Sequence, residues 1–457
     1  MALEATTVDT ASRVGATTAK PRTFPAKLRI YPWAVFALAF ALLLSDYMSR
    51  QVLSALFPLL KSQWALSDSR LASLNSIVAL MVGLLTFPLS VLADRWGRVK
   101  SLVLMGAVWS VATLLCAVAA NYHEMLGARF LVGVGEAAYG SVGIAVVLSI
   151  FAPRLRASLS GAFMAGGSYG SVVGVALGGV FAVRLGWRWS FAVMAIVGLA
   201  LVGLFRLVVT ERRLARHQCE ETTQVRETQG AGAFRAPMSS LFSSPSVLCA
   251  YLGSGLQMFV AAVLLAWTPS FLNRYYGMAP DKAGLVASIF VLLVATGMIC
   301  CGVVTDRVSR HHPARKWTTA IVYCLVSAVL LFVGFRLHPG TPQLALIAAG
   351  AFFSAGSSGP AVAMVGRLTH PTIRASAYGS LTMSNSLLGL ALGPFVVGVL
   401  ADRLGLLGAL QLVPVVFAAA VAVLLVGRRC YPAGLRRLAA LEQQRIAQAT
   451  ADAECEQ

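Results

Sequence analysis

Apolar stretches of about 20 residues recur along the chain and are separated by short polar segments. A helix needs about 20 mainly apolar residues to cross a bilayer, so this pattern predicts an all-α membrane protein with many spans. The predicted spans lie approximately at residues 33–59, 72–93, 99–120, 125–150, 157–182, 187–209, 246–272, 283–305, 317–336, 343–366, 373–400 and 406–427.

Positive charge alternates between successive loops. Most of the 37 Lys and Arg residues fall in the N-terminal segment, in every second loop and after the last span. The positive-inside rule then places both termini in the cytoplasm. The predicted organisation is a cytoplasmic tail (1–31), a six-helix domain (32–209), a cytoplasmic linker (210–245), a second six-helix domain (246–427) and a cytoplasmic tail (428–457).

Composition excludes several classes of function. The net charge of +19 lies where topology signals and lipid headgroup contacts are expected, so we predict contacts with membrane lipids and no nucleic-acid partner. The eight cysteines lack metal-ligand spacing, and no GxxxxGK[ST] loop or constellation of nucleophile, base and metal is present. We therefore expect no enzyme activity, cofactor or metal, and a monomer in a bacterial inner membrane.

The two halves repeat each other. Short motifs recur at the same place in the span order, which predicts a duplicated six-helix unit in parallel orientation. The recurring residues are Asp94, Arg95 and Arg98 with Asp306, Arg307 and Arg310; Pro153, Arg156, Ala157, Ser158 and Gly161 with Pro371, Arg374, Ala375, Ser376 and Gly379; and Arg184, Leu185 and Gly186 with Arg403, Leu404 and Gly405.

The repeated loop after the second span carries a cluster of charges. Asp94 ends a helix, Gly97 permits a tight turn, and the nearby arginines can donate to acids or helix C-termini. One interpretation is a topology signal with a turn. We favour a conformational latch between the domains, formed by Asp94, Arg95, Gly97, Arg98, Asp306, Arg307 and Arg310.

These motifs resemble a known family. The segment Ser90–Lys100, SVLADRWGRVK, is similar to the signature of the major facilitator superfamily between its second and third helices, with Ser90 in place of the usual Gly. Gly302–Arg310 is a degenerate copy, and Arg129, Gly133 and Gly135 resemble the R-x-x-x-G-x-G pattern of the fourth helix. The resemblance implies twelve helices in two bundles and alternating access around a central cavity.

Small residues repeat every turn in the fifth span. Such a stripe lets another helix approach closely, so helix packing at the domain interface is the favoured role and binding is the alternative. The residues are Gly166, Gly170, Gly174 and Gly178.

Three charges interrupt the apolar spans, and each costs about 2.5 to 3.5 kcal/mol at the bilayer centre on insertion scales. Asp46 and Arg50 lie one turn apart, so they can pair. With a rise of about 1.5 Å per residue, Asp46 lies ~21 Å up the first span and Glu136 ~16 Å down the fourth, at broadly similar depth. Arg129 shares a helix face with Glu136, and Tyr139 can join it.

Three interpretations of these charges remain: a static network in which Glu136 binds Arg129 or Arg50, a substrate site anchored by Arg50, and a carboxylate that exchanges a proton. We favour binding or coupling because the second half offers only Ser354 and Gln257 at the equivalent places. In the seventh span, Trp267 is interpreted as an interfacial anchor, with a cavity-facing kink at Pro269 as the alternative.

The run Gly133–Tyr139, GVGEAAY, together with Asp46-x-x-x-Arg50, is similar to the spinster branch of the superfamily and its bacterial relatives. That resemblance implies that Asp46, Arg50 and Glu136 are cavity or proton-coupling residues.

The sequence thus predicts a secondary transporter, coupled to protons, for an amphiphilic or organic anionic small molecule. The alternatives are a sensor or regulator on a transporter fold that moves no solute, and a multidrug efflux protein.

Overall fold

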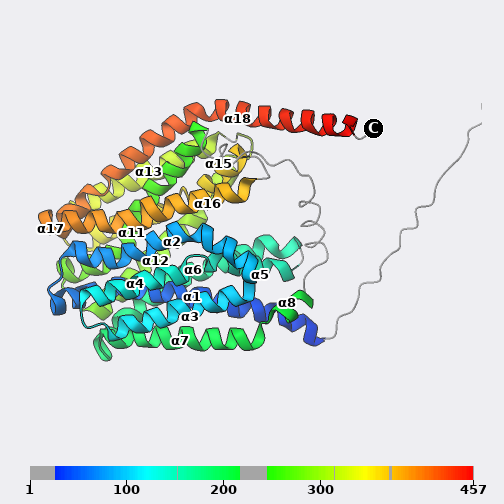
Figure 1. Cartoon of the computed structure of the whole chain (residues 1–457). Helices are drawn as coiled ribbons and strands as arrows, with labels where there is room; N and C mark the ends of the chain where they lie inside the picture. Colours follow the sequence, from blue (N-terminus) through cyan, green and yellow to red (C-terminus); the bar gives the residue numbers. More distant parts are fainter. Residues whose placement is uncertain (1–25, 152, 217–243, 313, 370–372, 456–457) are drawn as a thin grey trace, which may run out of the picture.

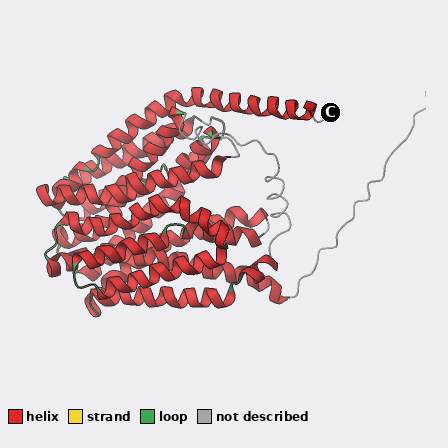
Figure 2. Ribbon diagram, in the orientation of Figure 1, coloured by secondary structure: helices red, strands yellow, loops and turns green. Residues whose placement is uncertain are grey.

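The computed structural model describes residues 26–151, 153–216, 244–312, 314–369 and 373–455, which are almost entirely helical and contain no strand (Figures 1 and 2). The predicted tail 1–31 and linker 210–245 fall mostly outside these ranges. The helices are α1 (Ala26–Trp64), α2 (Asp68–Trp96), α3 (Arg98–Val118), α4 (Tyr122–Glu136), α5 (Tyr139–Ile150), α6 (Pro153–Arg184), α7 (Trp187–Val208), α8 (Glu211–Arg216), α11 (Pro245–Tyr276), α12 (Pro280–Val308), α13 (Arg315–Gly334), α14 (Thr341–Ser354), α15 (Ser358–Leu368), α16 (Arg374–Ser384), η2 (Asn385–Ala391), α17 (Leu392–Leu412) and α18 (Val415–Cys455).

Twelve of the helical segments in the described residues are long and apolar enough to cross a membrane, which confirms the predicted fold class. Three of these segments are interrupted. One combines α4 and α5, one combines α14 and α15, and one combines α16, η2 and α17. The first two interruptions fall at equivalent places in the repeat, beside Glu136 in one half and Ser354 in the other.

The last two spans differ from the predicted boundaries. Gly405 adopts φ +73° and ψ 159°, and the chain nevertheless remains helical from residue 406 to Leu412. The twelfth span begins only at Val415, nine residues after the predicted start at 406. Apolar residues continue through the turn, so hydropathy alone does not mark where one helix ends.

The start of α1 and the end of α18 lie on the same side of the bundle, on the right in Figure 1. We call this side the termini face. The turn between α1 and α2 lies at the other end of the bundle, which we call the opposite face (Figure 1). The N-terminal half contacts the C-terminal half mainly where α6 meets α12, where α2 meets α17 and η2, and where α1 meets α11.

The glycine stripe of α6 packs against α1 within the N-terminal half, rather than across the domain interface. Gly166 lies against the Phe40 ring, and Gly178 lies against Val52. A Cβ atom at Gly174 would lie only 2.6 Å from the Met48 carbonyl oxygen. Because these glycines have no side chains, α6 can lie close to α1, the helix that carries Asp46 and Arg50.

Gly174→Ala is expected to reduce the stability of the folded protein by about 1 to 3 kcal/mol, because the added methyl group must push two helix backbones apart. Thermal unfolding of the purified protein in detergent measures this. Gly203→Ala on α7 is the matched control, since nothing lies within 4 Å of its added Cβ atom. A similar melting temperature for both variants would contradict the packing argument.

Candidate functional site: a charged cluster beside a cavity between the halves

Glu136 reaches the protein core because two glycines precede it on α4. The backbone of Val78 on α2 lies 2.9 Å from the position of a Cβ atom at Gly133. At Gly135 the corresponding distance to the Trp109 amide nitrogen on α3 is 2.6 Å. Helix α4 therefore packs directly on the backbones of both neighbours and ends at Glu136, whose side chain is 1% exposed.

Arg50 of α1 forms an ion pair with Glu136 of α4. Its Nε and Nη2 atoms lie 3.0 Å and 2.9 Å from the same carboxylate oxygen, Oε2. The other oxygen, Oε1, is buried and has no hydrogen-bond partner in the described structure. The sequence brings these residues together from positions 86 apart, at the similar depth that the helix rise predicts.

Asp46 adds a second carboxylate to this pair. It is 6% exposed and close enough to interact electrostatically with both Glu136 and Arg50. Its Oδ1 atom is buried, and within the described residues it has no hydrogen-bond partner. The sequence allows Arg50 to pair with Asp46 on the same helix, but in the structure it pairs with Glu136 on another helix. Two carboxylates thus lie beside one guanidinium group.

Arg129 does not neutralise either carboxylate by an ion pair in the described structure. Its fully buried guanidinium donates hydrogen bonds to the main-chain carbonyls of Leu74, Ser49 and Arg50, at 3.1, 3.4 and 3.4 Å. Arg129 therefore ties α4 to α1 and α2 beside the ion pair, and Arg50 remains the cation of the cluster.

Tyr139 lies in the same region but bonds elsewhere. Its hydroxyl donates to the Ala39 carbonyl at 3.0 Å, and its ring packs edge-on against Trp109. Because α4 is interrupted after Glu136, Tyr139 begins a separate helix, α5. Its hydroxyl contacts α1 at Ala39, about two turns before Asp46.

A cavity of about 100 Å³ separates the halves next to Arg50. Arg50 is 16% exposed, and its guanidinium lies 5.7 Å from the centre of the Tyr47 ring, so a cation–π contact helps to orient it. The cavity is lined by Tyr47, Arg50, Gln51, Asn75, Ala79, Ser171, Ala262, Leu265, Leu390 and Pro394. Ligand sites typically enclose about 300 to 1,000 Å³, so an organic solute needs the halves to move apart.

The second half has a neutral counterpart of the ion pair. The side-chain oxygen of Gln257 on α11 accepts hydrogen bonds from the backbone amide of Ser357, at 2.8 Å, and from its hydroxyl. Ser357 lies in the interruption between α14 and α15, three residues after Ser354, which is the equivalent of Glu136 at the end of α4. The repeat thus keeps the contact between the first helix of each half and the interrupted fourth helix, and only the N-terminal half uses charges there.

Trp267 is fully buried, so the prediction of an interfacial anchor is wrong. Its indole Nε1 donates to the Pro394 carbonyl at 3.2 Å, and its ring lies 5.4 Å from the ring of Phe57 in the other half. The tryptophan occupies the contact between α1 and α11. An apolar span gives no signal of which face its tryptophan points to.

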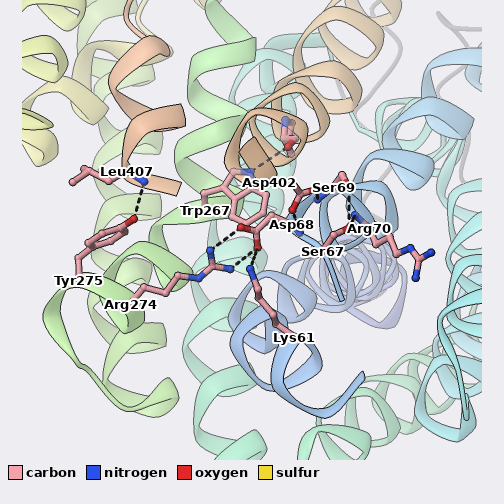
Figure 3. Close-up of polar contacts among 11 residues, drawn as sticks. Lys61, Ser67, Asp68, Ser69, Arg70, Trp267, Arg274, Tyr275, Asp402 and Leu407 are labelled. Carbon is pink, nitrogen blue, oxygen red and sulfur yellow. Dashed lines mark hydrogen bonds and ion pairs between the residues drawn. The ribbon is translucent and has the colours of Figure 1, made fainter. Parts of the chain in front are cut away.

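Sequence reasoning missed a cluster of charges at the opposite face (Figure 3). The carboxylate of Asp68, at the start of α2, accepts hydrogen bonds from Arg274 of α11 at 2.6 and 2.8 Å. Lys61 of α1 contacts the same carboxylate at 2.7 Å. The carboxylate of Asp402 on α17 accepts from the backbone amides of Asp68 and Ser69, at 2.6 and 3.0 Å. We call Asp68, Arg274 and Asp402 the interdomain cluster.

The interdomain cluster joins the halves twice. Arg274 binds a carboxylate of the other half, and Asp402 places negative charge at the N-terminus of α2, where a helix dipole favours it. Between described residues, the hydrogen bonds and ion pairs that we find across the halves all belong to this cluster. Gly398 allows the close approach, since its Cβ position lies 2.7 Å from the Asp68 carbonyl oxygen.

The repeated loop motifs make local contacts at the termini face. Gly97, at φ +104°, ends α2, and the nearby Glu211 carboxylate accepts a hydrogen bond from the Val99 amide at 2.8 Å. In the second half, Asp306 pairs with Lys316 at 3.4 Å. Arg95, Arg307 and Arg310 are exposed, Arg98 is partly exposed, and the side chain of Asp94 lies outside what the structure describes.

The family follows from comparison with known proteins. Residues 39–337 and 269–445 match the model of the Major Facilitator Superfamily. The chain therefore belongs to this superfamily, and it is an integral, multi-pass membrane transporter of small molecules.

Its relatives agree with the resemblance seen in the motifs. The chain is 27% identical over 318 residues to the probable L-galactonate transporter of Escherichia coli, covering 68% of each chain. It is 24% identical over 393 residues to Protein spinster homolog 1 of Xenopus laevis, covering 81% of this chain and 73% of that one. The resemblance to spinster proteins is thus confirmed.

Solved structures share the fold. A bacterial homolog of the human lysosomal transporter Spinster, in an inward-facing and unoccupied conformation, superposes with a TM-score of 0.75 at 17% identity, covering 88% of this chain and 98% of that chain. The D-xylose–proton symporter superposes with a TM-score of 0.69 at 17% identity, covering 86% of this chain and 97% of that one.

Arg274→Gln is expected to open the opposite face, because it leaves the buried Asp68 carboxylate with Lys61 alone. Removing one partner of a buried ion pair shifts such an equilibrium by on the order of tenfold or more. Cavity-lining Ser171→Cys, in a background without the eight native cysteines, reports the opening as faster labelling by a membrane-impermeant maleimide applied to that face.

Lys316→Gln is the matched control, since it breaks the ion pair with Asp306 inside one half. Labelling that rises equally in both variants, or stays unchanged in Arg274→Gln, would show that the interdomain cluster does not hold the halves together.

Proposed function

We propose that this transporter carries a small organic anion together with a proton, by alternating access. The observation that supports this most is the position of Arg50, which pairs with the buried Glu136 on one side and lines the cavity on the other. An anion in the cavity competes with Glu136 for the same guanidinium group.

The competition links the anion to a proton. One guanidinium group balances one negative charge, so in the resting site Asp46 and Glu136 hold one proton between them. When Arg50 turns to a substrate carboxylate, the one negative charge that remains on these two carboxylates loses its counter-ion in an apolar core. A buried carboxylate without a counter-ion takes up a proton rather than remain charged. One anion that binds to Arg50 is thus accompanied by one proton on the cluster, and the net charge of the site is unchanged.

The topology belongs to the same proposal. With both termini in the cytoplasm of a bacterium, the interdomain cluster closes the outer face, and the solute exchanges with the cytoplasm in this conformation. We propose that the loop motifs at the termini face, including Arg95 and Asp306, form the latch of the alternate conformation. Their places at equivalent loops of both halves support that role.

The names of several relatives support an organic anion. Among proteins similar to this chain are the Hexuronate transporter of Bacillus subtilis, 25% identical over 315 residues, and the Gallate transporter of Pseudomonas putida, 26% identical over 351 residues. Each name refers to a carboxylate, which is the group that a buried arginine binds best.

Glu136→Gln is expected to abolish solute flux driven by a proton gradient, while leaving exchange between solute pools on the two sides of the membrane, because glutamine is isosteric but neutral and cannot gain or lose the proton. Reconstituted vesicles with an imposed pH difference measure both activities. The solute for the assay is gallate, the aromatic acid among those named above.

Glu124→Gln is the matched control on the same helix. Glu124 lies near the start of α4, where it accepts from Asn121 and the Ala120 amide outside the core. Proton-driven flux that survives Glu136→Gln at the level of this control would reject the coupling assignment.

A further inference from the structure

The two walls of the cavity differ in chemistry. The N-terminal half contributes mostly polar side chains, namely Tyr47, Arg50, Gln51, Asn75 and Ser171 with the small Ala79. The C-terminal half contributes Ala262, Leu265, Leu390 and Pro394, none of which carries a polar side-chain atom. A solute that spans the cavity therefore meets hydrogen-bonding groups on one side and hydrocarbon on the other.

Polar groups of the C-terminal half do exist nearby, but they bind one another. The Gln257 oxygen accepts from Ser357, and its amide nitrogen lies 3.6 Å from the Cys324 sulfur. The Asn385 oxygen accepts from the Ser254 hydroxyl at 2.8 Å. The Pro394 carbonyl at the wall accepts from the Trp267 indole. The side chains of the apolar wall therefore offer no hydrogen bonding to a solute.

We infer that the substrate is a compact monoanion with one carboxylate and an apolar body, such as an aromatic or short branched aliphatic acid, and that polyhydroxylated sugar acids are rejected. This inference rests on the proposed function, since the carboxylate takes the place of Glu136 at Arg50. Arg50 is the one charged residue among the described residues that line the cavity, which sets a single negative charge.

Rejection of sugar acids follows from desolvation. A hydroxyl group placed against the side chain of Ala262 or Leu265 loses its hydrogen bonds to water and gains none from that side chain. An aromatic ring in the same place gains by leaving water. The inference separates this chain from the relatives named for galactonate and hexuronate, to which it is similar in sequence.

The binding test uses the purified full-length protein and three probes, measured by thermal stabilisation over a concentration series. Benzoate supplies a carboxylate on an apolar ring, benzamide removes the charge, and D-glucuronate replaces the ring with a polyol. The expected half-saturating concentration of benzoate is lower than that of either other probe by about tenfold or more, since each unpaired buried hydroxyl weakens binding several-fold.

A variant pair tests the apolar wall itself. Leu265→Asn adds hydrogen-bonding groups to that wall and is expected to reduce the preference for benzoate over D-glucuronate by about fivefold or more. Leu185→Asn makes the same change at an exposed position in the turn between α6 and α7, and is expected to keep the parental preference. Comparing affinities within one variant removes any general loss of folded protein.

Three results would overturn the inferred substrate class. They are D-glucuronate binding as tightly as benzoate, benzamide binding as tightly as benzoate, and a preference that is the same in Leu265→Asn and Leu185→Asn. Whichever of these three results is found, the loss of proton-driven flux in Glu136→Gln would still support the proposed function. Flux that survives in Glu136→Gln rejects the coupling without changing which probe binds best.

Discussion

The charge balance around Arg50 is the constraint on which the rest of the site depends. The carboxylates of Asp46 and Glu136 are buried together, and the one guanidinium group beside them, that of Arg50, is partly exposed at the cavity. A low-dielectric interior makes each unpaired charge costly, and this cost is the reason why, in the proposed mechanism, the cluster gains a proton when Arg50 turns to another partner. Arg129 stays out of this exchange because main-chain carbonyls occupy its guanidinium. Arg129 thus holds helices together, and Arg50 is the arginine left for the proposed binding of an anion.

The two halves share the backbone arrangement around this site, although only the N-terminal half has the charged side chains. Both halves bring the first helix against an interruption in the fourth, through Arg50 and Glu136 in one half and through Gln257 and Ser357 in the other. Gly179 and Gly398 lie at equivalent crossings of the opposite face, each against the first residues of a helix from the other half. The backbone geometry is therefore shared, and the side chains are specialised.

Much of this architecture is predictable from the sequence because it follows from local chemistry. Hydropathy and loop charge predict the twelve spans, and the spacing of glycines predicts the closeness of α6 to a neighbour. The depth of Asp46, Arg50 and Glu136 follows from the helix rise alone. The partner of each charged residue is harder to predict, since Arg50 lies one turn from Asp46 and yet pairs with Glu136 on another helix. That choice depends on the glycines of α4, which let this helix pack closely on α2 and α3 and so place Glu136 within reach of Arg50.

The interdomain cluster shows the limit of such reasoning more clearly. Asp68 and Arg274 are 206 positions apart and lie at helix ends, where charged residues are common and carry no signal of a partner. Only the packing of α2 on α17 places Asp402 at the N-terminus of α2. Likewise, no period in the sequence distinguishes the buried Trp267 from a tryptophan at the lipid headgroups. Contacts between the halves are set by how two rigid bundles meet, and a single chain pattern does not contain that geometry.

The positions of the two clusters suggest how a solute can move the bundles. The interdomain cluster lies at the opposite face, whereas Arg50 lies at the cavity, so no atom of a small solute touches both. A ligand shifts a conformational equilibrium only by the difference between its affinities for the two states. The conformation in which the opposite face is closed must therefore be favoured by a few kcal/mol at most. That is the scale of a partly exposed ion pair such as the one that Asp68 forms with Lys61 and Arg274. A stronger contact would hold the halves in one conformation, so the modest strength of this one fits the proposal that binding at Arg50 opens the other conformation.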